Sequence, residues 1–472
     1  MIELVKLTIE KAHADLVSGA YSAVDLAKAY LAQIEKRNSE LNAYLEVFSD
    51  VLEQARVADE RLKSKKNVTK LTGIPFAIKD NILIEGRRVS SASKILEGYV
   101  ATYDATAIKK LKDAGAIFLG RVNMDEFAMG GSTENSAYGV TKNPHDTTRV
   151  AGGSSGGSVA AMAADLCLVA LGSDTGGSIR QPAAFCGVVG LKPTYGSVSR
   201  SGLMAMGSSL DVIGPITKTV ADSEIVYQAI LGKDSLDSTS IDSPVVVSKK
   251  VLTFGIPRDF LKSDGIDASV RENFEQAVAH FKKLGHKIVD VSLPSLEYAL
   301  ATYYVLMPAE VSSNLSRFDG VKYGLRKEGA TLLDDYLKTR AEGFGAEARR
   351  RIILGTYVLS SGYYDAYYGR ACQVRNQIRA DFARVFAEVD VILTPTTPTP
   401  AFKIGEKSSN PLEMYLADIF TVPINLAGVP AISIPSGTVT VDGKKLPLGV
   451  QLIGGHGAEA TLFSASKQFL GE

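Results

Sequence analysis

The sequence lacks a net charge and has few cysteines. Its 52 lysines and arginines equal its 52 aspartates and glutamates, so no basic field would attract nucleic acid to this chain. The three cysteines, Cys167, Cys186 and Cys372, are an odd number and lie far apart in the sequence. Two of them have apolar or small neighbours, which predicts buried thiols rather than disulfides or zinc ligands.

Signals for membrane insertion and export are also lacking. The longest apolar run, residues 159–171, is too short to cross a bilayer and contains Asp165. The N-terminal segment is amphipathic and contains acidic residues, unlike a signal peptide. The 472 residues are 45% hydrophobic and 22% charged, as in a globular protein with a sizeable core. We therefore expect a cytoplasmic protein without membrane association.

Alternating strand and helix patterns predict an α/β fold with one large mixed sheet covered by helices on both faces. Short apolar runs predict strands at residues 74–79, 116–119, 166–171, 251–256, 389–393 and 431–434. Periodic patterns predict helices throughout 1–65 (Ser22 capping the second), at 105–114 after an Asp104 cap, at 158–165, at 268–284, through 296–388 and at about 457–470. Asp442-Gly443 predicts the type I′ turn of a hairpin.

We expect a single domain over residues 1–472, with no internal repeat. Within it, residues 1–65 form an N-terminal helical segment, and 66–232 form the core part that carries the site. Residues 233–388 are mainly helical and begin with a polar connector at 233–250. Residues 389–472 return to strands and end with a helix, which completes the core.

Two segments combine glycine with serine at high density: residues 152–158, GGSSGGS, and residues 174–178, DTGGS. Dense glycine costs conformational entropy and is expected where backbone N–H groups must approach a ligand closely. Ser178 precedes a helix-like stretch, so free N–H groups and the positive end of the helix dipole would favour a developing anion there. The alternative is a glycine-rich turn in which Ser178 merely caps the helix.

A serine nucleophile needs a base, and none of the five histidines lies in a motif that marks one. His145 is nearest in the sequence, but the preceding Asn-Pro predicts a turn that exposes it. Lys79 is the better candidate because it ends the apolar strand at 74–79. Such a lysine either snorkels to solvent or is buried, and burial lowers its pKa until the neutral amine can accept a proton.

Residues 73–80 (GIPFAIKD), 152–158 and 174–180 (DTGGSIR) together resemble the amidase signature family, and the resemblance extends over essentially the whole chain. It implies the fold of that family and a catalytic triad. In this triad Lys79 is the base, Ser154 is a bridging serine that follows a cis peptide bond, and Ser178 is the nucleophile. The resemblance also implies further residues around the oxyanion and the substrate: Thr175, Gly176, Gly177 and Met129.

Residues 312–320, 350–356 and 415–421 resemble, more narrowly, the A subunits of tRNA-dependent amidotransferases. This resemblance implies a glutaminase that passes ammonia to a partner subunit. The partner would amidate Glu-tRNA(Gln), Asp-tRNA(Asn) or both with ATP and Mg²⁺, in a heterotrimer with B and C subunits. Misacylated tRNA would bind mainly to the partner, and this chain would need no metal or cofactor.

Free glutamine carries a carboxylate and an ammonium group, so its site should hold a fixed cation and a fixed anion. By the resemblance, Arg351 binds the carboxylate and Asp418 the ammonium, and either Tyr303 or Tyr304 lines the pocket. Local sequence alone favours helix-surface charges for both Arg351 and Asp418.

Two positions depart from the pattern of the family, which commonly has tryptophan at His145 and proline at Ala151. Neither departure touches the triad. Two other functions stay open: a stand-alone amidase for small or aryl amides, and a non-enzymatic scaffold whose glycine segments bind phosphate. No GK[ST] follows those segments, which weakens the scaffold interpretation.

Overall fold

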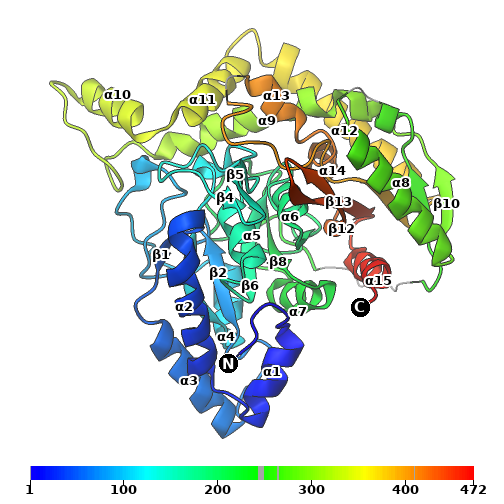
Figure 1. Cartoon of the computed structure of the whole chain (residues 1–472). Coiled ribbons are helices and arrows are strands. Elements are labelled where there is room, and N and C mark those ends of the chain that lie inside the picture. Colours follow the sequence, from blue (N-terminus) through cyan, green and yellow to red (C-terminus); the bar gives the residue numbers. More distant parts are fainter. Residues whose placement is uncertain (1, 243–248, 263–264, 409) are drawn as a thin grey trace.

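A computed structural model describes residues 2–242, 249–262, 265–408 and 410–472. Its centre is a mixed sheet of 11 strands in the order β1-β3-β2-β6-β8-β7-β12-β13-β11-β9-β10 (Figure 1). Their bounds are β1 Tyr44–Val47, β2 Pro75–Lys79, β3 Ile117–Val122, β6 Val169–Asp174, β7 Val189–Lys192, β8 Val212–Thr217, β9 Thr253–Ile256, β10 Lys287–Asp290, β11 Val391–Pro395, β12 Ala431–Val441 and β13 Lys444–Gly454. A separate pair joins β4 Lys142–Asn143 to β5 Asp146–Val150.

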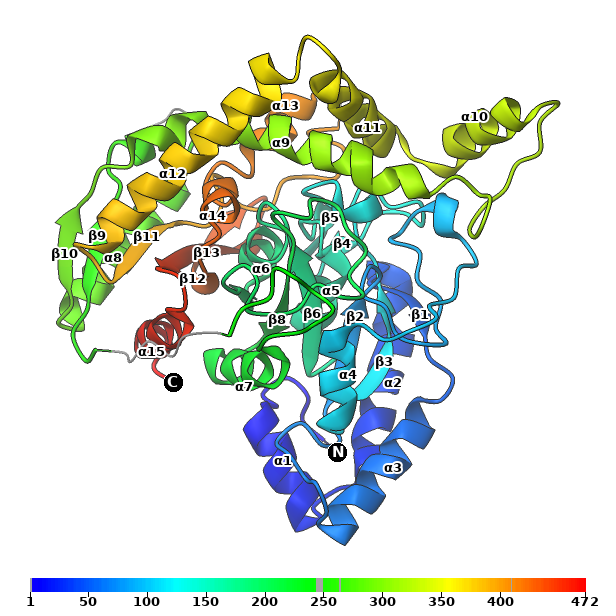
Figure 2. The same cartoon turned by 180° about the vertical axis from the view of Figure 1, so that it is seen from behind.

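Helices surround this sheet. Their bounds are α1 Ile9–Ser18, α2 Ala23–Leu41, α3 Val51–Ser64, α4 Thr106–Asp113, α5 Gly156–Ala163, α6 Arg180–Cys186, α7 Val220–Ile230, α8 Ala268–Lys283, α9 Ala299–Asn314, α10 Leu332–Gly343, α11 Ala346–Leu359, α12 Arg370–Phe386, α13 Pro411–Leu416, α14 Val422–Ala427 and α15 Glu459–Leu470. In Figure 2, α1 to α3 lie at the bottom, whereas α9 and α11 to α13 form an arc at the top from which α10 protrudes.

Helices cover both faces of the sheet, as β13 shows. A Cβ atom on Gly449 would lie 2.8 Å from Ala184 of α6, and one on Gly454 would lie 3.3 Å from Leu462 of α15. These glycines have opposite parity along the strand, and successive Cβ atoms point to opposite faces. The prediction of a large mixed sheet with helices on both faces is therefore confirmed.

The predicted strands and helices are present, with shifted ends. Ser22 caps α2 as predicted, and its side chain accepts from the N–H of Asp25. The hairpin turn is also confirmed, with φ of 52° at Asp442 and 76° at Gly443. The prediction that residues 1–65 are all helical is wrong at β1. Asn42 ends α2 in the left-handed conformation, and the chain then returns antiparallel to β3.

The predicted Asp104 cap is wrong as well. Ala105 precedes α4, and the Asp104 carboxylate instead accepts from the Glu85 N–H at 2.8 Å and pairs with Lys112 at 2.7 Å. Of the predicted connector at 233–250, residues 243–248 lie outside the described residues. The three cysteines have free thiols, with Cys167 and Cys186 buried as predicted. Within the described ranges, no helix is long and apolar enough to span a membrane.

Candidate active site

The site begins where two parallel neighbouring strands end. Lys79 is the last residue of β2 and Asp174 the last residue of β6, and Ile78 is paired with Leu171 between them. Because parallel strands run in the same direction, both residues lie at one edge of the sheet, where ligands bind in α/β proteins. The amine of Lys79 donates to the carbonyl of Ser173 at 3.2 Å.

Lys79 is fully buried, so it does not snorkel. Its amine donates to the hydroxyl oxygens of Ser154 and Ser155, each at 2.8 Å. Burial lowers the pKa of Lys79 to about 7, although the Asp125 and Asp174 carboxylates oppose the shift. An appreciable fraction of this amine is therefore neutral at neutral pH.

The first glycine–serine segment presents Ser154 to this amine. The Gly153–Ser154 peptide bond is cis, as the resemblance implied. A Cβ atom on Gly153 would lie 2.1 Å from Asp125 Oδ2, so no side chain fits there. Asp125 in turn accepts from the N–H groups of Thr133 at 2.8 Å and Asn135 at 3.1 Å. Burial raises the pKa of Asp125 to about 6. Sequence reasoning did not identify Asp125.

Ser178 lies in the second glycine–serine segment, two residues before α6. The Ser155 N–H donates to the Ser178 carbonyl at 3.1 Å, which holds the two segments together. In the part of the chain that the structure describes, Ser178 Oγ forms no hydrogen bond with Ser154 Oγ. Catalytic hydrogen bonds often tighten only when substrate binds, so this geometry does not conflict with a serine–serine relay.

Only some of the N–H groups in the predicted oxyanion-binding segment are free to bind an oxyanion. The Gly177 N–H donates to Asp174 Oδ1 at 2.8 Å, so it is already engaged. Among the described residues, the N–H groups of Thr175, Gly176 and Ser178 have no hydrogen-bond partner. These groups are the free donors of the segment that contains Ser178.

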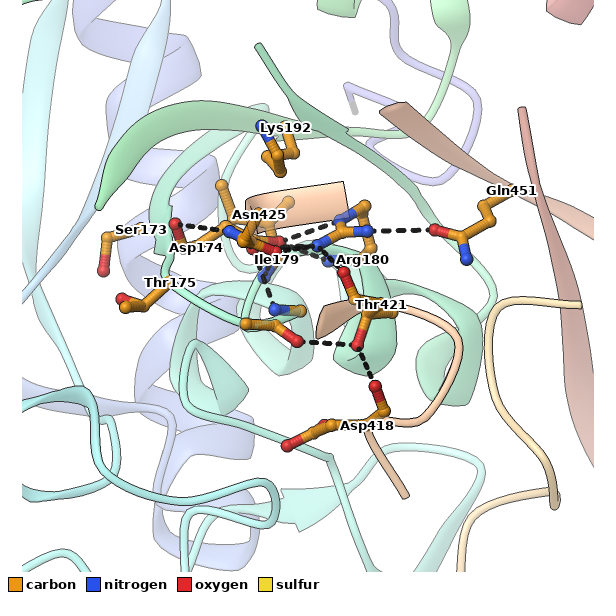
Figure 3. A network of polar contacts seen from close by, with 12 residues as sticks. Ser173, Asp174, Thr175, Ile179, Arg180, Lys192, Asp418, Thr421, Asn425 and Gln451 are labelled. Atoms are coloured by element: carbon orange, nitrogen blue, oxygen red, sulfur yellow. Dashed lines mark hydrogen bonds and ion pairs between the residues drawn. The ribbon is translucent and has the colours of Figure 1, made fainter. Parts of the chain in front are cut away.

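A buried ion pair fixes this segment (Figure 3). The Arg180 guanidinium donates to both carboxylate oxygens of Asp174 at 3.1 Å, and neither side chain is exposed. Arg180 also donates to Asn425 Oδ1 at 2.6 Å and to Gln451 Oε1 at 3.0 Å. Arg180 holds the pKa of Asp174 well below its usual range. The pair ties the 174–180 segment to α14 and β13.

The segment before α14 packs against Gly176. Thr421 Oγ1 donates to the Gly176 carbonyl at 2.7 Å. A Cβ atom on Gly176 would lie 2.7 Å from the Tyr303 hydroxyl. Tyr304 instead stacks on Tyr415 with ring centroids 3.8 Å apart. Of the two tyrosines, Tyr303 is therefore the one that contacts the segment containing Ser178.

Arg351 is buried on the inner face of α11, so the helix-surface alternative is wrong for this residue. Its Nε donates to Glu347 Oε1 at 2.7 Å, and its guanidinium lies 5.5 Å from the ring centroid of Tyr304 and 5.6 Å from that of Tyr415. Sequence reasoning missed Glu347, although its i,i+4 spacing from Arg351 was a usable signal.

Asp418 lies between α13 and α14 and is half-buried. Burial raises the pKa of its carboxyl to about 7, although the nearby Arg351 opposes the shift. Oδ1 of Asp418 also lies close to Gly131, since a Cβ atom there would be 3.9 Å from it. The site therefore combines the fixed cation of Arg351 with the Asp418 carboxyl group, whose charge depends on pH near neutrality.

Comparison with known proteins identifies the family, because the amidase family model matches residues 25–463. The chain belongs to the amidase family. The A subunit of glutamyl-tRNA(Gln) amidotransferase from Microcystis aeruginosa is 50% identical to this amidase over 470 residues, which is 98% of this chain and 96% of that protein.

Solved structures agree with this assignment. The crystal structure of the glutamyl-tRNA(Gln) amidotransferase A subunit from Thermotoga maritima has a TM-score of 0.80 and 42% identity, covering 99% of this chain and 95% of that one. Native peptide amidase from Stenotrophomonas maltophilia has a TM-score of 0.80 and 28% identity, covering 98% and 96%. The amidase fold is thus shared by proteins with different names.

The remaining predicted residues of this amidase lie near the site or away from it. Met129 is fully buried, and its carbonyl accepts from Asn135 at 3.0 Å, beside the Asp125 loop. His145 is exposed, and its ring contacts the Cys186 carbonyl at the end of α6 remote from Ser178. It therefore does not serve as the base. Ala151 is buried next to the same end of α6.

Proposed function

We propose that this amidase is the glutaminase subunit of a tRNA-dependent amidotransferase. The observation that carries the proposal is the buried contact between Lys79 and Ser154, which lies beside Ser178 at one edge of the sheet. Relatives about 50% identical, which are named as A subunits of glutamyl-tRNA(Gln) amidotransferase, support the choice of pathway.

The proposed reaction begins with the neutral amine of Lys79. Ser178 attacks the side-chain amide carbon of glutamine, and its proton passes to Ser154 while Ser154 gives its own proton to Lys79. Ammonia leaves with a proton returned by the same relay, and water then hydrolyses the γ-glutamyl ester on Ser178. The tetrahedral oxyanion accepts from the free N–H groups of Gly176 and Ser178, next to Thr175 and Gly177.

The hydrogen bonds favour Ser154 over Ser155 as the relay. The Ser155 hydroxyl donates its only proton to the Ser173 carbonyl at 3.1 Å, so it can only accept from Lys79. The Ser154 hydroxyl has no such acceptor among the described residues. When Lys79 is neutral, Ser154 is therefore free to donate to its amine. Ser155 is a positioning residue in this proposal.

The opposite end of the pocket would recognise the amino-acid part of glutamine. Arg351 would bind the α-carboxylate, because its guanidinium is buried and always charged. Asp418 would bind the α-ammonium, which favours the ionised form of a carboxyl with a raised pKa. Tyr303 and Met129 would line the wall between this end and Ser178.

Ammonia would then serve a second active site on a partner protein. In this proposal the partners are the B and C subunits, which use ATP and Mg²⁺ to amidate Glu-tRNA(Gln), Asp-tRNA(Asn) or both, in the cytoplasm. Misacylated tRNA would bind mainly to them, since this chain has no net charge. No cofactor is assigned to this chain.

The alternative function is that of a stand-alone amidase. The similarity in fold to a peptide amidase supports this alternative. The experiment is ammonia release from glutamine and from simple amides, by wild type, Arg351→Ala and Asp418→Ala. We expect glutamine hydrolysis that both substitutions impair. Hydrolysis of simple amides that neither substitution affects would favour the alternative.

A further inference from the structure

Glu126 is a buried carboxyl group that the proposed mechanism does not use. Its side chain is 2% exposed, and it begins a 3₁₀ turn at Glu126–Ala128. Burial of a carboxylate is costly unless charges or hydrogen bonds compensate for it. Within the described ranges Glu126 forms no salt bridge, and burial raises the pKa of its carboxyl to about 7. Hydrogen bonds must therefore supply most of the compensation.

Those hydrogen bonds connect Glu126 to the junction between α10 and α11. Both of its carboxylate oxygens accept from the N–H of Gly345, at 2.8 and 3.1 Å. The Ser93 hydroxyl donates to Glu126 Oε1 and lies 3.3 Å from the Gly343 carbonyl. Gly345 directly precedes α11, where the helix dipole favours a negative charge. Glu126 thus fixes the start of α11 from a position 219 residues earlier in the chain.

The contact leaves no room for a side chain on Gly345. A Cβ atom there would lie 2.5 Å from Glu126 Oε2. The backbone of Gly345 has φ of −68° and ψ of 171°, a conformation open to any residue. The close approach of Glu126, and not the backbone conformation, is therefore what excludes a side chain. Next to this contact, Phe127 packs on Phe344 with ring centroids 5.8 Å apart.

On one side of the contact, α11 carries the proposed carboxylate anchor. Arg351 lies six residues after Gly345, and its Nε donates to Glu347 in the first turn of the helix. The junction lies where α10 protrudes from the arc (Figure 2). Residues of one helix keep fixed positions relative to one another, with a rise of about 1.5 Å per residue. The placement of Gly345 therefore sets where the Arg351 guanidinium lies.

On the other side of the contact, the chain leads from Glu126 towards the ammonium anchor. The last two residues of the 3₁₀ turn have φ of 47° and 63°, a conformation that surrounding contacts must stabilise. The Met129 N–H then donates to the Glu126 carbonyl at 2.9 Å. Two residues later, a Cβ atom on Gly131 would lie 3.9 Å from Asp418 Oδ1. Glu126 thus belongs to the segment that approaches Asp418.

We propose that Glu126 is a positioning residue for glutamine binding. Its contact with Gly345 sets the separation between the Arg351 guanidinium and the segment beside Asp418. The inference rests on the proposed function, because those two groups are the proposed anchors of glutamine. Lys79 and Ser178 lie on other elements, so loss of the contact should weaken binding and leave the chemical step nearly unchanged.

The test uses Glu126→Ala, Glu126→Gln and Gly345→Ala, with Asp222→Asn as the matched control. Asp222 is also a buried carboxyl, and it accepts at 2.9 Å from the N–H of Ile9 at the start of α1, which lies at the opposite end of the molecule from α11 (Figure 2). The dissociation constant for glutamine is measured by calorimetry on each variant in a Ser178→Ala background. KM and kcat for ammonia release are measured with Ser178 intact.

Glu126→Ala and Gly345→Ala should each raise the dissociation constant and KM about tenfold or more, with kcat changed by less than about threefold. Glu126→Gln keeps an oxygen that accepts from the Gly345 N–H, so its affinity should stay within about threefold of wild type. Asp222→Asn should bind glutamine as wild type does. In the double variant Glu126→Ala/Gly345→Ala, the methyl group no longer meets a carboxylate, so the two losses should not add.

The other outcomes contradict the proposal in distinguishable ways. Wild-type affinity in Glu126→Ala and Gly345→Ala overturns it, as do additive losses in the double variant or a fall in kcat at unchanged KM. If Glu126→Ala does not fold, Gly345→Ala and Glu126→Gln decide by the same criteria. Absence of glutamine binding by Ser178→Ala with Glu126 intact overturns the proposed function and this inference with it. Glutamine binding that is indifferent to Glu126 overturns this inference alone.

Discussion

The amine of Lys79 lies 2.8 Å from the hydroxyl oxygen of Ser154, in a region where neither side chain is exposed. Water is excluded from this contact, so the protonation state of Lys79 is set by burial and by three neighbouring carboxylates. The proposed chemistry requires the neutral amine, and the first prediction follows from this requirement.

Turnover is expected to rise with pH through about 7, the pKa of Lys79. Below that value the amine is protonated and cannot accept a proton from Ser154. The measurement is single-turnover acylation from pH 5.5 to 9, which isolates the chemical step. A rate that does not change across pH 7 would contradict the assignment of Lys79 as base.

Lys79→Met is expected to be inactive and more stable than wild type. The folded pKa of about 7 lies below the ordinary value of 10.5, so the unfolded chain binds more protons between these values and wild-type stability rises with pH there. The increase in stability produced by Lys79→Met should accordingly be larger at pH 6 than at pH 9. Thermal unfolding of wild type and Lys79→Met at pH 6 and pH 9 tests this prediction. A Tm for Lys79→Met below that of wild type at pH 6 would refute it.

Ser154→Ala and Ser155→Ala should reduce turnover to different extents. We expect loss of the relay hydroxyl in Ser154→Ala to reduce turnover by about a hundredfold to ten-thousandfold. Ser155→Ala removes an acceptor from Lys79 but no transferred proton, so a loss of about tenfold or less is expected. Steady-state kinetics of both variants decides, and equal losses would argue against Ser154 as the sole relay.

Glutamine binding should weaken as pH falls through about 7, the pKa of Asp418. The protonated carboxyl loses its attraction for the α-ammonium, and loss of that charge-assisted contact costs about ten- to a hundredfold in affinity. Calorimetry on Ser178→Ala separates binding from catalysis. Asp418→Asn in that background should bind weakly at every pH. Retention of the wild-type pH profile by this variant would remove Asp418 from the ammonium site.

Arg180→Met should destabilise the protein by about 3 to 5 kcal/mol, because Asp174 would remain as a buried unpaired charge. Arg56→Met, which breaks an exposed pair with Glu53, serves as the matched control and should cost about 1 kcal/mol or less. Denaturant unfolding of both variants gives the comparison. A cost for Arg180→Met as small as that of the control would show that the network in Figure 3 is not structural.

Sequence alone predicted the sheet, the hairpin and the three segments that meet at the site. Local sequence made Lys79 a candidate because it ends an apolar strand, and Ser178 because glycines precede it. The resemblance to the family then assigned their roles. The partners of Arg180 were not predictable, since Asn425 of α14 and Gln451 of β13 lie more than 240 residues away and meet it only in the folded chain. The role of Ser155 depends on a carbonyl of β6, which no motif records.

The central claim is that Ser178 forms a γ-glutamyl ester while ammonia leaves. It is tested by ammonia release together with intact-mass spectrometry of the chain quenched during turnover, for wild type and Ser178→Ala. Ser158→Ala is the control, since Ser158 lies in the first glycine–serine segment and donates to the Leu171 carbonyl rather than to Lys79. We expect a glutamyl adduct on wild type and on the control, and neither adduct nor ammonia from Ser178→Ala. Turnover by Ser178→Ala near the wild-type rate would contradict the account.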